Sequence, residues 1–397
     1  MENVRATTRP ALWLMVSILL VALNLRPSMA AVGPLLSAIR GDIPLSFSLA
    51  SLLTMLPVMA MGLAMFFGLS VSQRLGEQRT VVISLSIIGL ATVSRLFVDS
   101  AAELILSAML AGIGIALIQA LMPALIKSRF SDNVAVCMGL YVTSIMGGAA
   151  IAASFAPLVM ARTGSWRAGL AIWAALALVA LLFWGLGRAG TSAPTVLAPR
   201  NTSFLTHSRA WLLAVFFGLG TASYTCVLAW LAPYYVEKGW SEQNAGLLLG
   251  FLTAMEVLSG LVTPAIANRS RDRRLVLVVL LALIMAGFCG LILSPQHFSL
   301  LWPCLLGLGI GGLFPMSLIV SLDHLDNPQR AGGLTAFVQG IGYLIAGLSP
   351  LMAGMVRDRS GSFESAWWCL TGVMALMILI ALRFNPRHYA RQFPGAT

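Results

Sequence analysis

The sequence predicts an all-α membrane protein in which twelve transmembrane helices form two six-helix bundles. Three observations support this: an apolar composition, twelve long apolar runs, and a repeat that relates the two halves of the chain. Of the 397 residues, 58% are hydrophobic and 10% are charged, and the mean hydropathy is +0.89. Soluble domains carry about 25% charged residues, so this composition excludes a water-soluble protein. Its apolar richness also excludes intrinsic disorder.

Each apolar run is long enough to cross a bilayer, which takes about 20 residues. Lipid offers no hydrogen-bond partners, so each run must satisfy its own backbone groups as a helix. We expect spans at residues 12–36, 47–71, 80–97, 102–124, 133–160, 167–187, 209–234, 243–266, 275–293, 299–321, 332–355 and 366–384.

The basic residues predict the orientation of these spans, because Lys and Arg accumulate in cytoplasmic loops. If the N-terminus is cytoplasmic, 17 of the 25 basic residues fall on the cytoplasmic side. The opposite side holds Arg40, Arg95, Arg162, Arg167, Lys238, Arg357 and Arg359, and Arg26 lies within a span. We therefore expect an inner-membrane protein with both termini in the cytoplasm. This topology also explains the net charge of +11 without a nucleic-acid partner.

The motifs of other function classes are missing from the sequence. It holds no Gly-x-x-x-x-Gly-Lys-Ser/Thr loop for ATP, no metal-binding cluster and no nucleophile elbow. We expect no enzyme activity, no cofactor and no metal. The five cysteines lie in apolar runs without the spacing of a disulfide framework, and we interpret them as small core hydrophobes: Cys137, Cys226, Cys289, Cys304 and Cys369.

An internal repeat with an offset near 195 relates the two sets of six spans. The matching pairs are Gln73-Arg74 with Asn268-Arg269, Glu77 with Asp272, Arg79 with Arg274, Gly112-Ile113-Gly114 with Gly307-Leu308-Gly309, and Pro157 with Pro350. An even number of spans in each half gives the halves the same orientation, as in transporters with parallel repeats. We predict an N-terminal bundle at 1–188, a cytoplasmic linker at 189–208 and a C-terminal bundle at 209–397.

Twelve spans, a parallel repeat and basic loops after spans 2 and 8 resemble the major facilitator superfamily. In the first of these loops, Arg74, Gly76 and Arg79 fit the superfamily signature, whereas Gln73 and Asn268 stand where an Asp is usual. The resemblance implies the fold of that superfamily and secondary transport by alternating access.

A narrower resemblance covers nearly the whole chain and is to the cyanate transporter branch, which includes proteins assigned to nitroimidazole compounds. The motifs that carry it are Asn24-Leu25-Arg26-Pro27 with Val32-Gly33-Pro34-Leu35-Leu36, Gln119-Ala120-Leu121-Met122-Pro123 with Ile126-Lys127, Ala229-Trp230-Leu231, Leu322-Asp323-His324, and Gln339-Gly340-Ile341-Gly342-Tyr343 with Ala346-Gly347-Leu348. This resemblance implies cyanate as the example substrate, although members of the branch differ in substrate.

Two ionisable residues lie near the middle of spans, where a charge costs about 2.5–3.5 kcal/mol on insertion scales. Arg26, in span 1, keeps its charge and offers five donors in a planar fork. We predict that Arg26 binds a small anion, a carboxylate or a nitro group. Glu256, in span 8, is our candidate for proton coupling, because the charge state of a buried carboxylate responds to its surroundings. The alternative is a structural role, in which Arg26 bonds helix carbonyls or forms an ion pair with Glu256.

Small and polar residues accompany Glu256 at steps of three and four, which places them on one face of span 8. They are Gly246, Gly250, Thr253, Gly260 and Pro264, and we expect this face to pack closely against other helices. Neutral polar residues in other spans also suggest a central cavity. We expect the substrate there to contact Gln119 in span 4, Tyr224 and Trp230 in span 7, and Gln339 in span 11; hydrogen bonding between helices is the alternative for the two glutamines.

For three further polar residues the sequence predicts a structural role and no contact with the substrate. We expect Asn24 to bond a neighbouring helix, and Arg95 to be a charge at a span end that reaches water or pairs with Asp99 or Glu103. We expect His324 to be a solvated residue at a helix end.

Together these features predict a monomeric carrier that takes up a small anion together with a proton. A second hypothesis is a proton-driven exporter of a small neutral or nitroaromatic compound, with Arg26 holding the nitro group. A third is a membrane sensor that transports nothing, which the short loops disfavour.

Overall fold

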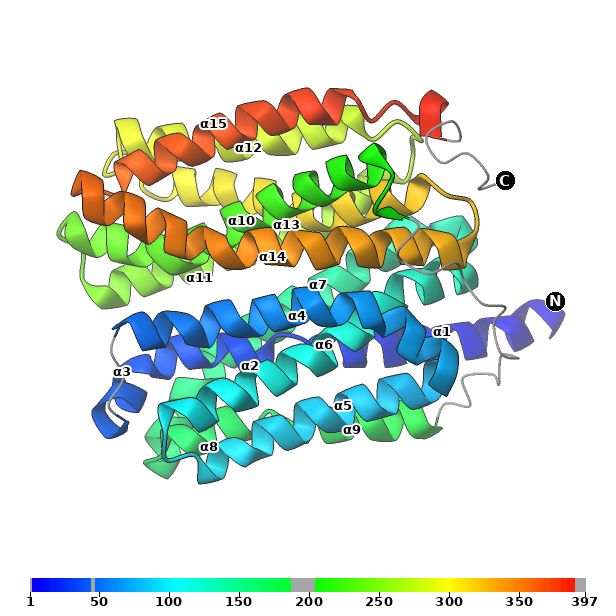
Figure 1. The fold of residues 1–397 in the computed structure, drawn as a ribbon, viewed down its shortest axis with the longest axis horizontal. Coiled ribbons are helices and arrows are strands. Elements are labelled where there is room, and N and C mark those ends of the chain that lie inside the picture. The colour runs from blue at the N-terminus through cyan, green and yellow to red at the C-terminus, as the bar shows by residue number, and fades with distance from the viewer. Residues whose placement is uncertain (1, 44–46, 187–203, 390–397) are drawn as a thin grey trace. The chain divides into compact units, whose positions relative to one another are not determined.

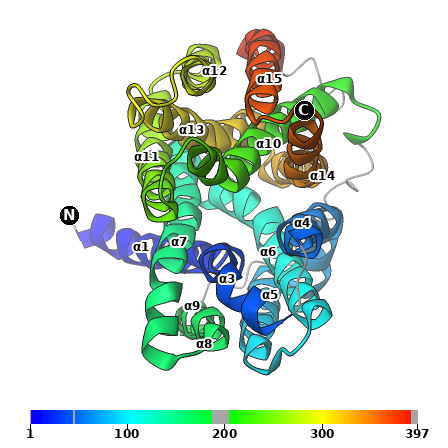
Figure 2. The same cartoon turned by 90° about the vertical axis from the view of Figure 1, so that its left-hand side faces the viewer.

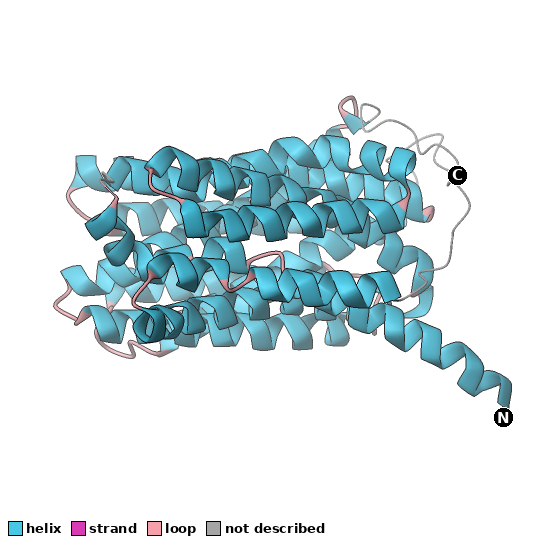
Figure 3. Cartoon of the chain, turned by 90° about the horizontal axis from the view of Figure 1, so that it is seen from below, coloured by secondary structure: helices cyan, strands magenta, loops and turns pink. Residues whose placement is uncertain are grey.

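The computed structural model describes residues 2–43, 47–186 and 204–389. These residues form helices and connecting loops, with no strand among them (Figure 3). Twelve helical segments are long and apolar enough to span a membrane, which confirms the prediction from the sequence. The spans are Leu12–Leu36, Leu52–Leu75, Glu77–Phe97, Ala101–Arg129, Ser131–Thr163, Trp166–Leu186, Ser208–Glu237, Asn244–Ala267, Arg274–Leu293, Leu301–Asp323, Pro328–Arg357 and Glu364–Leu382.

The first six spans are built from nine α-helices and two short 3₁₀ helices, because spans 1 and 6 are divided. These elements are α1 (Glu2–Leu23), α2 (Pro27–Ala30), α3 (Val32–Asp42), α4 (Phe47–Leu75), α5 (Glu77–Val93), η1 (Ser94–Phe97), α6 (Ala101–Arg129), η2 (Ser131–Asn133), α7 (Val134–Thr163), α8 (Trp166–Ala171) and α9 (Ala174–Leu186).

Each of the last six spans is a single helix, and a 3₁₀ turn follows the last of them. These elements are α10 (Ser208–Glu237), α11 (Glu242–Ala267), α12 (Arg274–Leu293), α13 (Leu301–Asp323), α14 (Pro328–Ser360), α15 (Glu364–Leu382) and η4 (Pro386–His388).

The chain divides into two compact units, one of residues 1–132 with 140–200 and one of 133–139 with 201–397. In the first unit α6 packs against both α4 and α5, and α5 also packs against α9. In the second unit α10 packs against α14, and α13 packs against α11 and α12 (Figures 1 and 2). Of the predicted linker at 189–208, residues 189–203 lie outside the described residues.

The internal repeat is visible in how glycines of the fourth span of each set contact the second span. A Cβ added to Gly112 in α6 would lie 2.7 Å from the carbonyl oxygen of Pro57 in α4. A Cβ added to Gly307 in α13 would lie 2.5 Å from the carbonyl oxygen of Leu252 in α11. Gly307 lies 195 positions after Gly112, and Leu252 lies 195 positions after Pro57. Each glycine is therefore required by the same close approach of two backbones.

A second pair of glycines shows the same repeat against the third span of each set. A Cβ on Gly114 would lie 2.8 Å from the carbonyl oxygen of Ser84 in α5, and one on Gly309 would lie 2.7 Å from that of Leu280 in α12. The fourth span of each set is thus held between the second and third spans by glycines at matching positions.

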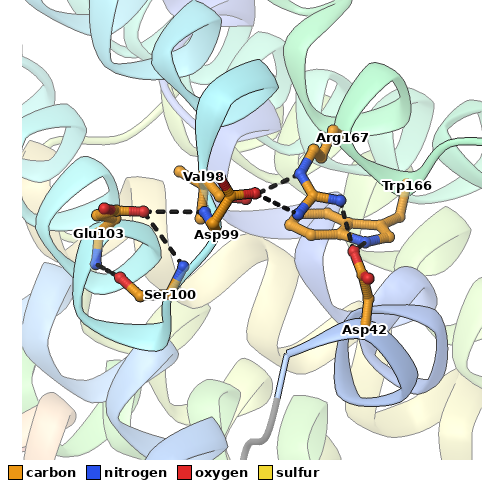
Figure 4. Close-up of polar contacts among 7 residues, drawn as sticks. All are labelled: Asp42, Val98, Asp99, Ser100, Glu103, Trp166 and Arg167. Atoms are coloured by element: carbon orange, nitrogen blue, oxygen red, sulfur yellow. Dashed lines mark hydrogen bonds and ion pairs between the residues drawn. The ribbon is translucent and has the colours of Figure 1, made fainter.

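Arg167 connects the end of α3, the segment before α6 and the start of α8 at one end of the first unit (Figure 4). Arg167, at the start of α8, forms ion pairs with Asp42 at the end of α3 (2.5 Å) and with Asp99 before α6 (2.9 Å). The indole Nε1 of Trp166 donates to the same Asp42 carboxylate at 3.0 Å, and these two donors hold the pKa of Asp42 below its usual value. Both carboxylates are exposed to solvent, so this network lies at the surface of the unit.

The start of α6, next to this network, is capped by side chains. Ser100 and Glu103 form a capping box at the start of α6, in which each side chain accepts a hydrogen bond from the backbone N–H of the other residue (Figure 4).

The second unit has an ion pair at a position that corresponds to Asp42. Glu237, 195 positions after Asp42, ends α10 and pairs with Arg357 of α14 at 2.6 Å. In each unit, therefore, a carboxylate at the end of the first span binds an arginine from the region of the fifth and sixth spans.

Candidate functional site

The first span is interrupted near its middle, and the sequence explains why. Pro27 has no N–H group, so the carbonyl of Leu23 loses the donor that would continue the helix. The amides of Asn24 and Leu25 instead bond the carbonyls three residues earlier, at 3.1 and 3.0 Å. Helix α1 ends at Leu23 and α2 begins at Pro27, with Arg26 between them at φ −125° and ψ −24°. Arg26 thus lies in non-helical backbone inside a membrane span.

Two contacts within the first unit stabilise this interruption. Gly148 of α7 lies against the freed carbonyl of Leu23, since an added Cβ there would be 2.2 Å from that oxygen. The side chain of Asn24 donates to the carbonyl of Leu20 at 2.8 Å and to that of Leu176 in α9 at 3.4 Å. The second contact confirms the prediction that Asn24 bonds a neighbouring helix.

Arg26 itself is half-buried. Non-helical backbone at membrane depth is tolerated only inside protein or beside water, and discontinuous helices of this kind form the ion and substrate sites of many transporters. An interrupted helix that carries a permanent positive charge is therefore suited to hold an anion.

Arg95 differs from the prediction, because it neither reaches water nor pairs with Asp99 or Glu103. Its side chain is fully buried in η1, with Nε donating to Ser107 Oγ of α6 at 3.1 Å and Nη1 donating to the carbonyl of Ser28 in α2. Asp99 pairs with Arg167 instead, and Glu103 caps α6. Ser107, a polar residue inside the apolar run of the fourth span, was a partial signal for this inward orientation, whereas Ser28 contributes only its backbone carbonyl, which no side-chain pattern reveals.

Glu256 lies where the backbones of α11 and α13 approach each other closely. A Cβ on Gly311 of α13 would fall 2.2–2.6 Å from the backbone of Glu256 in α11. The Glu256 side chain is 1% exposed, and its Oε1 has no hydrogen-bond partner among the described residues. The predicted close packing of its helix face is wrong at Gly246 and Gly250, where an added Cβ would meet no atom within 4 Å.

The other predicted binding residues have different environments. Gln119 in α6 and Gln339 in α14 are both buried, and Nε2 of Gln339 has no hydrogen-bond partner in the described part of the chain. Tyr224 in α10 is half-buried. The indole of Trp230 donates to the carbonyl of Pro350 at 3.1 Å. Because this donor is engaged in holding α10 to α14, Trp230 has only its ring face to offer a ligand.

His324 is buried at the end of α13, so its predicted exposure to solvent is wrong. Its Nε2 accepts from Arg209 Nε at 3.0 Å, and its Nδ1 therefore carries the proton and donates to the carbonyl of Val320 at 2.6 Å. The ring of Tyr389 stacks on the imidazole at 3.7 Å between centroids. The segment after α15 thus covers a histidine that the pattern of α13 alone leaves exposed.

The five cysteines differ in their burial. Cys137 and Cys226 are buried, Cys289 and Cys304 are half-buried, and Cys369 is exposed, so the interpretation as a core residue is wrong for Cys369. Among the described residues, no three His, Cys, Asp or Glu side chains lie close enough to hold a metal ion.

Twelve spans in a six-plus-six repeat, with an interrupted first span, define a membrane carrier. The family model of the Major Facilitator Superfamily matches residues 14–350, so the chain belongs to that superfamily. It is a membrane transporter and not an enzyme.

Two Escherichia coli K12 proteins are similar to it over nearly their whole length. The cyanate transport protein CynX is 40% identical over 376 residues, which are 93% of this chain and 96% of CynX. The 2-nitroimidazole transporter is 28% identical over 373 residues, 93% of either chain. Among solved structures, the proton:xylose symporter XylE superposes with a TM-score of 0.80 at 13% identity, covering 95% of this chain and 96% of XylE. That likeness concerns the fold.

Proposed function

We propose that this transporter takes up a small monovalent anion of the cyanate class by alternating access, together with a proton. The observation that carries the proposal is Arg26, a permanent cation in the non-helical turn that interrupts the first span. The 40% identity to a cyanate transport protein supports the choice of anion.

The proposed binding chemistry follows from the donors that the two units offer. The guanidinium of Arg26 supplies charge and a planar fork of donors. The amide of Gln339, which has an unpartnered Nε2, and that of Gln119 would add neutral donors to the anion. Tyr224 would contribute a hydroxyl. We assign Trp230 to supporting packing, because its N–H is bonded to Pro350.

Proton coupling would remove the electrical cost of anion uptake. Moving one negative charge into a negative interior costs about 2.3 kcal/mol per 100 mV, and a proton carried in the same step cancels that charge. We propose Glu256 as the proton carrier, because its buried Oε1 has no hydrogen-bond partner among the described residues that would fix its charge state. A carboxylate that is bound to nothing else can gain and lose a proton as the site changes.

The basic loops support a placement in the inner membrane with both termini in the cytoplasm, and we propose a monomeric carrier. Because the repeats are parallel, rocking of one six-helix bundle against the other would expose the site to each side in turn.

Uptake of labelled cyanate into proteoliposomes with an imposed pH gradient tests the proposal. We expect acid outside to drive accumulation. In Glu256→Gln we expect cyanate exchange to persist while proton-driven accumulation is lost. Unchanged accumulation in Glu256→Gln would reject its coupling role, and absence of cyanate flux in the unmodified protein would reject the substrate class.

A second candidate function is proton-driven export of a nitroaromatic compound, favoured by the 28% identity to a 2-nitroimidazole transporter. The same vesicles distinguish the two, because an exporter in inverted vesicles accumulates labelled 2-nitroimidazole when the lumen is acidic. Flux of neither compound would favour a sensor.

A further inference from the structure

Arg95 is a buried cation that the proposed binding site does not use. Its side chain is 0% exposed, and none of its nitrogens pairs with a carboxylate among the described residues. Nε donates to Ser107 Oγ, Nη1 donates to the Ser28 carbonyl, and Nη2 has no hydrogen-bond partner in the described part of the chain. Burying a guanidinium with only neutral partners is costly, so its presence calls for a role that a neutral side chain could not fill.

The partners of Arg95 connect it to the interruption of the first span. Ser28 lies in α2, a helix of four residues that begins directly after Arg26. On its N-terminal side Pro27 donates no bond, and the amides of Asn24 and Leu25 bond carbonyls three residues earlier instead of four. The bond from Arg95 therefore connects this short helix to the third span next to the interruption of the helical bonding.

The other end of the contact is rigid. Ser107 Oγ donates to the carbonyl of Leu104 at 2.7 Å, which orients its lone pairs toward Arg95 Nε. The planar guanidinium thus bridges a fixed acceptor in α6 and the carbonyl in α2, and its fork geometry sets the distance between them.

Arg167, in the same unit, has the environment of an arginine with an ordinary structural role. It is partly exposed, it pairs with two carboxylates, Asp42 and Asp99, and its Nε donates to the carbonyl of Val98 at 2.8 Å. Arg95 has neither the exposure nor, among the described residues, a carboxylate partner, so its positive charge stays uncompensated by acids next to the segment that carries Arg26.

We propose that Arg95 is the positioning residue for Arg26: through the Ser28 carbonyl it fixes α2, and so the direction in which Arg26 presents its guanidinium to the anion. This inference rests on the proposed function for the role of Arg26, but the mechanical link between Arg95 and the interruption can be measured independently. Lysine would keep the charge of Arg95 without the planar fork, and glutamine would keep N–H donors without the charge.

The experiment compares Arg95→Lys, Arg95→Gln and Ser107→Ala with Arg167→Gln as the matched control, which removes ion pairs from the same unit without touching α2. Two readouts are used: KM and kcat for cyanate uptake in proteoliposomes, and hydrogen exchange of the backbone amides of residues 24–31. We expect both Arg95 variants to raise KM by about tenfold or more, because losing the charge-assisted hydrogen bond to the Ser28 carbonyl lowers the fraction of protein in which Arg26 is correctly placed, and to speed exchange at 24–31 only. Arg167→Gln should change neither KM nor that exchange.

Unchanged KM and unchanged exchange in Arg95→Gln would overturn the proposal, and so would faster exchange spread over all of the first unit. If the Arg95 variants do not fold, Ser107→Ala decides in their place, because it removes only the fixed acceptor; unchanged exchange at 24–31 in that variant would overturn the proposal. If Arg26→Ala binds cyanate normally while Arg95→Gln still speeds exchange at 24–31, the proposed function fails and the link between Arg95 and the interruption stands.

Discussion

Replacing Gly148 by alanine tests the contact that stabilises the interrupted first span. The new Cβ would lie 2.2 Å from the carbonyl oxygen of Leu23, whereas a carbon and an oxygen in contact need about 3.3 Å. The two segments must therefore separate by about 1 Å. Overpacking of this kind costs about 1–3 kcal/mol, against a gain of about 1 kcal/mol in helix propensity from Gly to Ala.

Gly147 is the matched control, because it is the adjacent residue in the same helix. There the nearest atom to an added Cβ is Cδ2 of Leu23 at 4.0 Å, an ordinary contact, so Gly147→Ala keeps the gain in propensity without the clash. The two variants should differ in free energy of unfolding by about 1–3 kcal/mol, and a domain of this size shifts by about 2–4 °C per kcal/mol.

The assay is thermal unfolding of the purified variants in one detergent, followed by cyanate uptake. We expect Gly148→Ala to melt several degrees below Gly147→Ala and to transport less, since the Leu23 carbonyl adjoins the turn that carries Arg26. Equal melting temperatures and equal uptake would refute the close contact between α1 and α7.

Three further predictions concern other parts of the fold. Asp42→Asn should lower the melting temperature at pH 7. Because the pKa of Asp42 is lowered in the folded protein, its contribution to stability is present above the unfolded pKa of about 3.9 and is lost as the pH falls through the folded pKa. A difference in melting temperature between variant and parent that stays the same at a pH below the folded pKa would contradict this. Ser100→Ala should cost about 1 kcal/mol by removing the cap of α6, measured as thermal unfolding, and an unchanged melting temperature would argue against the capping box. Gly112→Ala and Gly307→Ala should destabilise their units alike, and a large difference in melting temperature would show that the repeat is not structural at these sites.

The sequence predicted the spans well because hydropathy alone determines them. The repeat could be recognised in the sequence because it includes Gly112 and Gly307. In the structure both glycines lie where two helix backbones nearly touch, so neither position has room for a side chain. The interruption of the first span at Pro27 was not predicted, because a run of apolar residues does not show by itself that a helix is broken.

Side-chain directions near span ends were harder to predict. Arg95 lies one turn from a loop, and only the placement of Ser28 and Ser107 on neighbouring helices draws it inward. His324 is buried because Tyr389, 65 residues later in the chain, stacks on it. Both outcomes depend on tertiary contacts between segments that are distant in the sequence, and periodicity within one helix carries no information about them.

Binding of cyanate to Arg26 variants measures whether this guanidinium holds the anion. Purified protein is titrated with cyanate in a buffer whose other anions are too large for the site, and binding is followed by intrinsic tryptophan fluorescence with labelled cyanate as a check. The parent protein should bind saturably, Arg26→Ala should lose binding, and Arg26→Lys should lose most of it because the ammonium lacks the planar fork. Normal affinity in Arg26→Ala, in a variant that melts like the parent, would contradict the role assigned to this guanidinium.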